Sequence, residues 1–539
     1  MSKSNQKSKW LVVAILALAQ FVMVLDSTVM NVSISKVVQD LNTTVSALQS
    51  AITFYTLTMA AFMLLGAKLC AKWGLLRAFV IGSVVYGIGS LLTGLSPNIT
   101  TLFLGWSIIE GLGAVLVIPA IAALIAINYK GKDRVVAYAI IGGISGAAAA
   151  AGPLIGGFMT TYLSWRYVFI AETIVMLFVL IMSRRFEDTS KPLKIKIDLP
   201  SVFLSVTGMV LLVYGMLQSK TWGWITPMAK PSINGHSIAP LGISIVAYLI
   251  IGGLFVMKLF IDRQTKLENL KRNPLVQVSM LKIAQLQSGL VVLMSQYVVT
   301  AAVFFVVPIY LQMVLGLDAL KTGIKIFPLS VALIIFSILG SKMVNRKTPK
   351  QIVRVGQWLL VIGSVCLLAA IDPELTGYAF ALSMFAVGAG LGLLASQLGA
   401  VNMSAVDESK SSEVGGLSGT FQNLGSSFGT ALIGSMMVLA LTSSFMSSIT
   451  NNPSLPDNVK SSISEKAQQT GVPIVSAASV EQSALSNGLS EQQASQLSSD
   501  YESSQLFGLK RAIFVLIIIT LLSIMLSKSI PDKVIKSSN

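Results

Sequence analysis

The chain has few charged residues, one histidine and two cysteines. Only 12% of its 539 residues are charged, whereas a soluble protein usually carries about 25%. Cys70 and Cys366 both fall in or beside apolar segments, so no disulfide framework is indicated. Because His236 is the single histidine, the sequence excludes a His-cluster metal site and most His-based catalysis. We therefore expect no catalytic residue, no metal ion and no cofactor.

Long apolar runs are abundant instead. A membrane-spanning helix needs roughly 20 mostly apolar residues, and fourteen segments meet this requirement. Their centres lie near residues 21, 57, 85, 112, 147, 176, 208, 249, 294, 333, 363, 388, 429 and 518. The first run, Trp10 to Val32, is too long for the apolar region of a signal peptide, so we interpret it as a retained helix. The sequence predicts an all-α polytopic membrane protein.

The net charge of +16 is a topology signal rather than a sign of nucleic-acid binding. If the N-terminus is cytoplasmic, 29 of the 39 Lys and Arg residues lie in or beside cytoplasmic segments, and the opposite orientation would reverse that ratio. The positive-inside rule therefore favours a cytoplasmic N-terminus. An even number of spans then places the C-terminus in the cytoplasm as well.

The spacing of the spans indicates a six, two, six organisation. We expect a six-helix bundle at 10–182, a linker at 183–197, two extra helices at 198–261, a second linker at 262–284 and another six-helix bundle at 285–528. A short cytoplasmic tail follows at 529–539. The last bundle contains a Ser-rich extracytoplasmic stretch, 442–508, that we expect to be partly helical or disordered. Two six-helix halves suggest a pseudo-symmetric transporter with a central site.

The fifth predicted helix contains GGISGAAAAAGPLIGG, residues Gly142 to Gly157. Small residues let two helices approach closely in lipid, and Pro153 should kink the helix because it removes a backbone hydrogen bond. Such a helix suits an element that rocks, although tight static packing explains the composition equally well. The chain carries no phosphate-binding loop, so an ion gradient is the expected energy source.

Several phrases together resemble the major facilitator superfamily, in particular its 14-helix drug:proton antiporters, the QacA/EmrB-like group. They are LDSTVMNVSI (Leu25 to Ile34), GPLIGG (Gly152 to Gly157), SWRYVF (Ser164 to Phe169), TWGW (Thr221 to Trp224), PIYLQMVLGLDALKTGIKIFP (Pro308 to Pro328) and GGLSGTFQNLGSSFGTA (Gly415 to Ala431). The resemblance implies the major facilitator fold and proton-coupled export. It also assigns Gly152, Pro153, Gly156 and Gly157 to the antiporter motif of that group.

The chain departs from this family at three places. The gating segment between helices 2 and 3 retains Gly66, Lys72, Gly74 and Arg77, but Ala71 stands where the family has Asp. In helix 4, Ser107 and Glu110 stand where the family has Arg and Gln, and in helix 6 Glu172 replaces Asn. The chain has thus lost a buried cation and gained two buried acids.

Asp26, Glu110 and Glu172 are the acids that lie within spans, and we expect them to couple transport to protons or to contact substrate. We place Asp26 and Glu172 in the outer third of the bilayer and Glu110 near its midplane. An ionised acid near the centre of a spanning helix costs roughly 2.5–3.5 kcal/mol, which suits a carboxyl that gains and loses a proton in each cycle. A nearby cation would cancel this effect, and Arg166 is the candidate ion-pair partner for Asp26.

Each of these residues also has a structural interpretation. Asp26 could cap a helix or pair with Arg166, Glu110 could stay protonated and bonded to a neighbouring helix, and Glu172 could be hydrated in an outer vestibule. Lys325 is expected to reach outward to the membrane surface. The glutamines Gln20, Gln296, Gln357 and Gln397 are expected to join helices, and His236 is expected to be an ordinary loop residue.

The sequence thus predicts a monomeric bacterial inner-membrane transporter, driven by protons, that exports hydrophobic and cationic small molecules. Acids in an apolar cavity favour lipophilic cations. Membrane lipid is its expected surrounding, and no nucleic acid is expected to bind. Three alternatives stay open at this point: the same fold moving a lipid or lipid-linked substrate, a membrane-embedded transferase, and a non-transporting sensor or scaffold.

Overall fold

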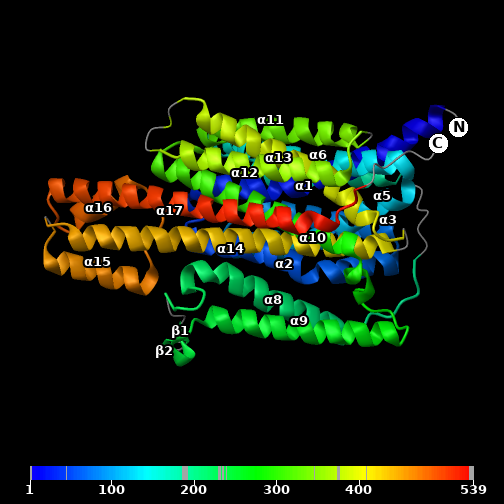
Figure 1. Ribbon diagram of the computed structural model, residues 1–539, viewed down its shortest axis with the longest axis horizontal. Helices are drawn as coiled ribbons and strands as arrows, with labels where there is room; N and C mark the ends of the chain where they lie inside the picture. Colours follow the sequence, from blue (N-terminus) through cyan, green and yellow to red (C-terminus); the bar gives the residue numbers. More distant parts are fainter. Residues whose placement is uncertain are drawn as a thin grey trace.

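The protein is a bundle of long helices that lie roughly side by side (Figure 1). The computed structural model describes residues 3–43, 45–184, 192–228, 232–233, 236–237, 239–344, 346–372, 375, 377–407, 410–453 and 455–532. Within them, 14 helices are long and apolar enough to cross a membrane. This confirms the predicted number of spans, and every predicted centre falls inside one of them.

The first six spans are formed by α1 (Lys3–Asp40), α2 (Val45–Trp73), α3 (Leu75–Gly94), α4 (Ile99–Leu102) continued by the π-helix η1 (Phe103–Glu110) and α5 (Gly111–Asn128), α6 (Gly131–Tyr162) and α7 (Arg166–Ser183). Two middle spans are α8 (Leu199–Trp222) and α9 (Ile245–Asn269). The last six are α10 (Ala284–Ile309) continued by the π-helix η4 (Tyr310–Val314), α11 (Ala319–Met343), α12 (Pro349–Ala370), α13 (Ala379–Met403), α14 (Ser411–Asn451) and α17 (Glu491–Leu526).

The remaining described elements are short. They are the antiparallel pair β1 (Ser232–Ile233) and β2 (His236–Ser237), the 3-10 helices η2 (Pro240–Gly242), η3 (Val278–Lys282) and η6 (Ser527–Ser529), and the helices α15 (Asp457–Thr470) and α16 (Ala477–Ser486). We call the side of the bundle where α1 begins and α17 ends the terminal face. The opposite side, where α15 and α16 lie, is the cap face (Figure 1).

Local sequence explains several helix ends. Asn98 and Asp198 accept hydrogen bonds from backbone N–H groups in the first turns of α4 and α8. Thr348 and Ser490 form capping boxes with Gln351 and Gln493 at the starts of α12 and α17. Gly74 separates α2 from α3 with a φ of 94°, a conformation that glycine adopts readily.

Two seams join the N-terminal half (α1–α7) to the C-terminal half (α10–α17). At the first, α6 packs against α11 and α13, and a Cβ on Gly142 would lie 2.5 Å from the Ala395 carbonyl oxygen. At the second, α2 packs against α14 near the terminal face, where a Cβ on Gly416 would lie 2.5 Å from the Ala67 Cβ. The small-residue run in α6 therefore provides close helix packing between the halves.

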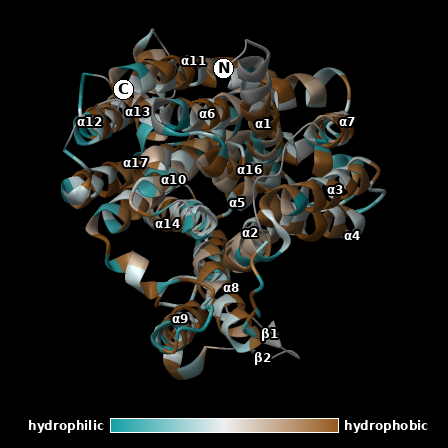
Figure 2. Ribbon diagram, turned by 90° about the vertical axis from the view of Figure 1, so that its right-hand side faces the viewer, coloured by the Kyte–Doolittle hydropathy of each residue, from teal (hydrophilic) through white to brown (hydrophobic). Residues whose placement is uncertain are grey.

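The two middle helices lie outside the two halves, against α2 and α14 (Figure 2). Their ends at the terminal face are joined by polar contacts. The Arg263 guanidinium of α9 donates to both carboxylate oxygens of Asp198, at 2.7 and 2.8 Å, and the Gln264 amide of α9 donates to the Ser201 hydroxyl at 2.7 Å. These bonds hold α8 and α9 together as one hairpin.

The Asp198–Arg263 pair predicts an acid-sensitive contribution to stability. The guanidinium holds the pKa of Asp198 below its ordinary value, so the pair stabilises the folded protein above about pH 4 and this contribution is lost as the pH falls further. We expect Asp198→Asn to lower the free energy of unfolding by about 1 kcal/mol at pH 7, because the pair is partly exposed. Thermal unfolding in detergent at pH 7 and pH 3 checks this, since the gap between variant and wild type should be smaller at pH 3. A gap of equal size at both pH values would contradict it.

The Ser-rich stretch 442–508, expected to be partly helical or disordered, is largely helical in the part that the structure describes. α14 and α17 both extend past the bundle and, with α15 and α16, form a helical cap. Its core consists of buried apolar side chains at Leu441, Phe445, Ile449, Leu455, Ala467, Val472, Ala484, Ala494, Leu497 and Tyr501. The stretch therefore contains enough spaced apolar residues to bury a small core of its own.

Candidate functional site

The three acids predicted from the sequence lie together in the N-terminal half. Asp26 is on α1, Glu110 ends η1 and Glu172 is on α7, and one carboxylate oxygen from each lies within 4.8 Å of the others. Their exposed fractions are 0%, 0% and 2%. Among the described residues they are the one group of this kind close enough to share a cation.

The common depth of the three acids corrects the expectation that Glu110 lies deeper than the others. The span that contains Glu110 covers Ile99–Asn128 and has 30 residues, so it is longer than one bilayer crossing requires. Glu110 therefore lies in the cap-side half of this span rather than at its centre. The sequence identified the three residues, and the structure shows that they form one cluster.

Aromatic side chains hold Asp26 in place. The Trp106 indole N–H donates to both carboxylate oxygens of Asp26, at 2.8 and 2.9 Å. The Trp106 ring stacks on Tyr55 of α2, with centroids 4.9 Å apart and an angle of 10° between the planes. The Ser107 hydroxyl, next along η1, donates to the Ala51 carbonyl at 2.7 Å. These contacts fix η1, and with it Trp106 and Glu110, against α1 and α2.

The opposite side of the cluster is formed by α3. A Cβ on Gly89 would lie 2.6–2.7 Å from backbone and Cβ atoms of Glu110, so only glycine allows α3 this close. Ser90 and Tyr86, both fully buried on the same stretch of α3, lie beside the Glu110 carboxyl. Within the described part of the chain, the oxygens of Glu110 and Glu172 and both of these hydroxyls have no hydrogen-bond partner.

This arrangement cannot hold three negative charges. Two carboxylates about 4 Å apart repel each other by about 4 kcal/mol at an effective dielectric constant of 20. None of the ion pairs found among the described residues involves Asp26, Glu110 or Glu172. The cluster must therefore balance its charge with bound protons or another cation.

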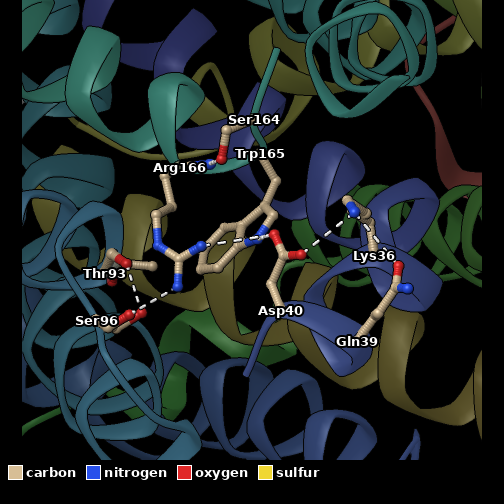
Figure 3. Close-up of polar contacts among 8 residues, drawn as sticks. All are labelled: Lys36, Gln39, Asp40, Thr93, Ser96, Ser164, Trp165 and Arg166. Atoms are coloured by element: carbon tan, nitrogen blue, oxygen red, sulfur yellow. Dashed lines mark hydrogen bonds and ion pairs between the residues drawn. The ribbon is translucent and has the colours of Figure 1, made fainter. Parts of the chain in front are cut away.

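The expected pairing of Arg166 with Asp26 is wrong. Arg166 lies at the cap-face start of α7, where its guanidinium is 3.6 Å from an Asp40 carboxylate oxygen and donates to the Ser96 carbonyl at 3.0 Å (Figure 3). It also lies 4.6 Å from the centroid of the Trp165 ring, whose N–H donates to Asp40. Asp26 lies almost four helical turns before Asp40 on α1. The contacts with Asp40 and Ser96 therefore hold the arginine away from the acid cluster.

The antiporter motif lies on the face of α6 that packs against α1. A Cβ on Gly152 would collide with the Thr28 hydroxyl, and one on Gly156 would lie 2.9–3.1 Å from Val29 and Val32. Pro153 is inside the helix, and its carbonyl would lie 2.9 Å from a Cβ on Gly323 of α11. Gly157 is buried. The motif thus places α6 between the helix that carries Asp26 and the C-terminal half.

We expect Gly152→Ala to impair the transport that the family resemblance implies, because the new methyl group must push α6 away from Thr28, two residues along α1 from Asp26. A several-fold lower initial rate of substrate uptake into vesicles, at equal protein amount, would be the result. Gly252→Ala on α9 is the matched control, since nothing lies within 4 Å of a Cβ at that position. Equal rates for both variants would show that this close approach is not needed.

The segment between helices 2 and 3 contains a contact that sequence reasoning missed. Lys72 and Arg77 are exposed, and a Cβ on Gly66 would collide with the Val115 carbonyl. The buried cation here is instead Lys68, whose ammonium is 3.0 Å from a Glu413 carboxylate oxygen in the first turn of α14. The available signals were a lysine at the end of one predicted span and an acid at the start of another. This ion pair joins the two halves near the terminal face.

Two of the four glutamines within spans join helices, as expected, whereas no such bond is found for Gln20 or Gln296 in the part of the chain that the structure describes. The Gln397 amide donates to the Gly340 carbonyl at 3.0 Å, which links α13 to α11, and the Gln357 amide donates to the Ser523 hydroxyl at 2.6 Å, which links α12 to α17. Lys325 is exposed on α11. At the cap face, a cavity of about 470 Å³ lies between the halves, lined by residues of α1, α6, η4 and the turn before α11.

The sequence is similar to a known protein family and to several resistance and export proteins. The sequence profile of the Major Facilitator Superfamily matches residues 16–430. The puromycin resistance protein of Streptomyces alboniger is 28% identical over 68% of this chain and 68% of its own length. The tetracenomycin C resistance and export protein of Streptomyces glaucescens is 24% identical over 79% of this chain and 76% of its own. The multidrug transporter protein MdtP of Bacillus subtilis is also 24% identical, over 81% and 77%.

Two solved transporter structures share the fold of this chain over nearly its whole length. The proton:xylose symporter XylE superposes with a TM-score of 0.56 and 13% identity, and the match covers 99% of this chain and 98% of that one. The human organic anion transporter MFSD10 has the same TM-score at 10% identity, with 96% and 99% covered. At these identities the likeness concerns the fold.

Proposed function

The chain belongs to the major facilitator superfamily, so it is a transporter rather than an enzyme, and we propose that it exports hydrophobic, cationic small molecules in exchange for protons. The observation that carries this proposal is the buried cluster of Asp26, Glu110 and Glu172, whose charge must be balanced by a proton or another cation. A lipophilic cation and protons can compete for such a site. Antibiotic resistance and export proteins among its relatives support outward transport.

In this proposal the terminal face is cytoplasmic and the membrane is the cell membrane of a bacterium. A cytoplasmic cation enters when the acids are deprotonated, because the cluster then carries negative charge in apolar surroundings. After the protein reopens toward the cap face, protons enter from outside and displace the cation. Return to the cytoplasmic side releases the protons and completes the cycle.

The described conformation fits one state of this cycle. Lys68 and Glu413 hold the halves together at the terminal face, while at the cap face an open depression of about 470 Å³ lies between α1 and α6 on one side and η4 and the turn before α11 on the other. Bistable contacts of this kind are the usual elements of alternating access, in which one half rocks against the other.

Purified protein in liposomes with an imposed pH gradient tests the proposal, with ethidium as the fluorescent lipophilic cation. We expect gradient-dependent accumulation that collapses when a protonophore is added. Empty liposomes and a folded variant with all three acids replaced serve as controls. Accumulation that ignores the protonophore would contradict proton coupling, and absence of transport by folded protein would contradict the substrate class.

A further inference from the structure

The two seams between the halves are built differently. Along the first, α6 contacts α11 and α13 directly, through Gly142 and Gly143 near the terminal face and, nearer the cap face, where Pro153 meets Gly323 of α11. At the second, α2 and α14 meet directly near the terminal face, around Met63 and Gly419. Farther toward the cap face, a third helix shares this second seam.

That third helix is α8. Val213 and Leu217 of α8 form a buried apolar cluster with Leu57 and Ala60 of α2, and Leu424 of α14 packs against the same cluster. Phe54 of α2 adds a ring contact to Tyr214, with centroids 6.2 Å apart. Seen along the bundle, α8 lies at the junction of α2 and α14, with α9 on its outer side (Figure 2).

The contacts of α8 with α14 include polar ones. The Ser219 and Ser435 hydroxyls are 2.9 Å apart and both are buried. The loop after α8 continues this attachment, because the Trp224 ring lies 6.4 Å from Phe428 of α14 and the Met228 methyl would lie 3.2 Å from a Cβ on Gly471 in the cap. At the terminal face, the Gln264 side chain of α9 accepts a bond from the Leu275 N–H, in the linker that leads to the C-terminal half.

Against α2 itself, the described contacts of α8 are made by apolar and aromatic side chains, so a shift between the two helices need not break a hydrogen bond. One backbone bond ties the hairpin to the N-terminal half. The Leu193 N–H donates to the Ala71 carbonyl at 3.0 Å, in the extended stretch before α8 begins. This bond lies at the terminal face, where it can act as a pivot.

We propose that α8, together with α9, is a lateral seal that moves with the C-terminal half and slides against α2. The seal closes the cap-side part of the α2–α14 seam to the bilayer, so that substrate leaves to water rather than into lipid when this face is open. The inference rests on the proposed transport function. It assigns a role to the two helices that the chain carries in addition to two six-helix halves.

Cross-linking distinguishes the fixed contact from the sliding one. Cys70 and Cys366 are first replaced by serine, and transport of ethidium is verified in that background. Ser219→Cys with Ser435→Cys then allows a link between α8 and α14, since hydroxyls 2.9 Å apart place the two Cβ atoms within reach of a disulfide or a short bifunctional thiol reagent. Phe54→Cys with Tyr214→Cys allows a link between α2 and α8 with a reducible bifunctional thiol reagent, since these two rings are in contact with centroids 6.2 Å apart. Leu212→Cys with Gly253→Cys, within the hairpin, is the matched control.

We expect the α8–α14 and control links to retain most of the transport rate, and the α2–α8 link to reduce it at least tenfold, with recovery after reduction of a disulfide. The proposal would be overturned if the α8–α14 link blocked transport while the α2–α8 link left it fully active. It would also be overturned if all three links left transport fully active. Each pair is measured before linking and after reduction. Failure to transport in the unlinked state of the serine background would count against the transport function, whereas the contrast between links concerns only the seal.

Discussion

Replacing Glu110 by Gln is expected to reduce proton-driven accumulation of a lipophilic cation at least tenfold. Glu110 is fully buried, lies within 4.8 Å of the carboxylates of Asp26 and Glu172, and its own oxygens have no hydrogen-bond partner among the described residues. An amide keeps the shape of the side chain but can neither bind nor release a proton. A tenfold loss corresponds to about 1.4 kcal/mol.

The same reasoning applies to Glu172→Gln and Asp26→Asn, with one difference. Asp26 has Trp106 as a donor to both carboxylate oxygens, so an amide there also disturbs a hydrogen bond, and some loss of folded protein is expected. Glu172 has no such partner in the described structure, which makes it the cleaner test. Glu502→Gln, in the helical cap, is the control for removal of an acid as such.

Two assays separate coupling from folding and binding. Accumulation against a gradient requires proton exchange, whereas exchange of labelled for unlabelled substrate at equal concentrations requires only binding and the conformational change. We expect Glu110→Gln to lose the first activity and to retain part of the second. Wild-type accumulation in a variant with all three acids replaced would refute the role of the cluster.

The number and placement of spans were predictable from the sequence because each is a local property. A run of about 20 apolar residues must cross the bilayer as a helix, whatever its neighbours do. The three acids were identifiable for the same reason, since a carboxyl inside such a run is costly and unusual. That they share one site depends on how α1, η1 and α7 pack, and no local pattern carries that information.

The errors had the same origin. Arg166 was a candidate partner for Asp26 because it stands at the outer start of its helix, but in the structure its partners are Asp40 and Ser96. Lys68 and Glu413 are 345 residues apart, so their pairing is a consequence of tertiary packing alone. In the cap, polar residues dominated the composition, and the apolar positions that form its core were too widely spaced to stand out.

Loss of the Lys68–Glu413 ion pair is expected to open the terminal face. The two side chains are only 7% and 11% exposed, and they connect α2 to the first turn of α14. Lys68→Met leaves the Glu413 carboxylate buried without its cation, and removal of one partner from a buried pair typically costs about 3–5 kcal/mol. The protein can avoid this cost by separating α2 from α14, because the carboxylate then reaches water.

This opening can be measured by labelling. Met63→Cys places a thiol on α2 where Gly419 of α14 now covers it, in a background without Cys70 and Cys366. In inverted membrane vesicles, a membrane-impermeant maleimide should label this thiol at least tenfold faster when Lys68→Met is added. Lys72→Met, which removes an exposed lysine from the same segment, is the control and should leave the rate unchanged.

Double substitutions separate the charge from the size of the side chains. Lys68→Glu with Glu413→Lys should restore slow labelling only in part, because a lysine in the first turn of α14 meets the positive end of the helix dipole, which costs about 0.3–1 kcal/mol. Lys68→Met with Glu413→Met should label as slowly as wild type or more slowly, since apolar replacement of a buried pair is often neutral or stabilising. Transport should also slow in that variant, because a seam without charges gains nothing from opening to water. If Lys68→Met alone left the labelling rate unchanged, the ion pair would not be what keeps this face closed.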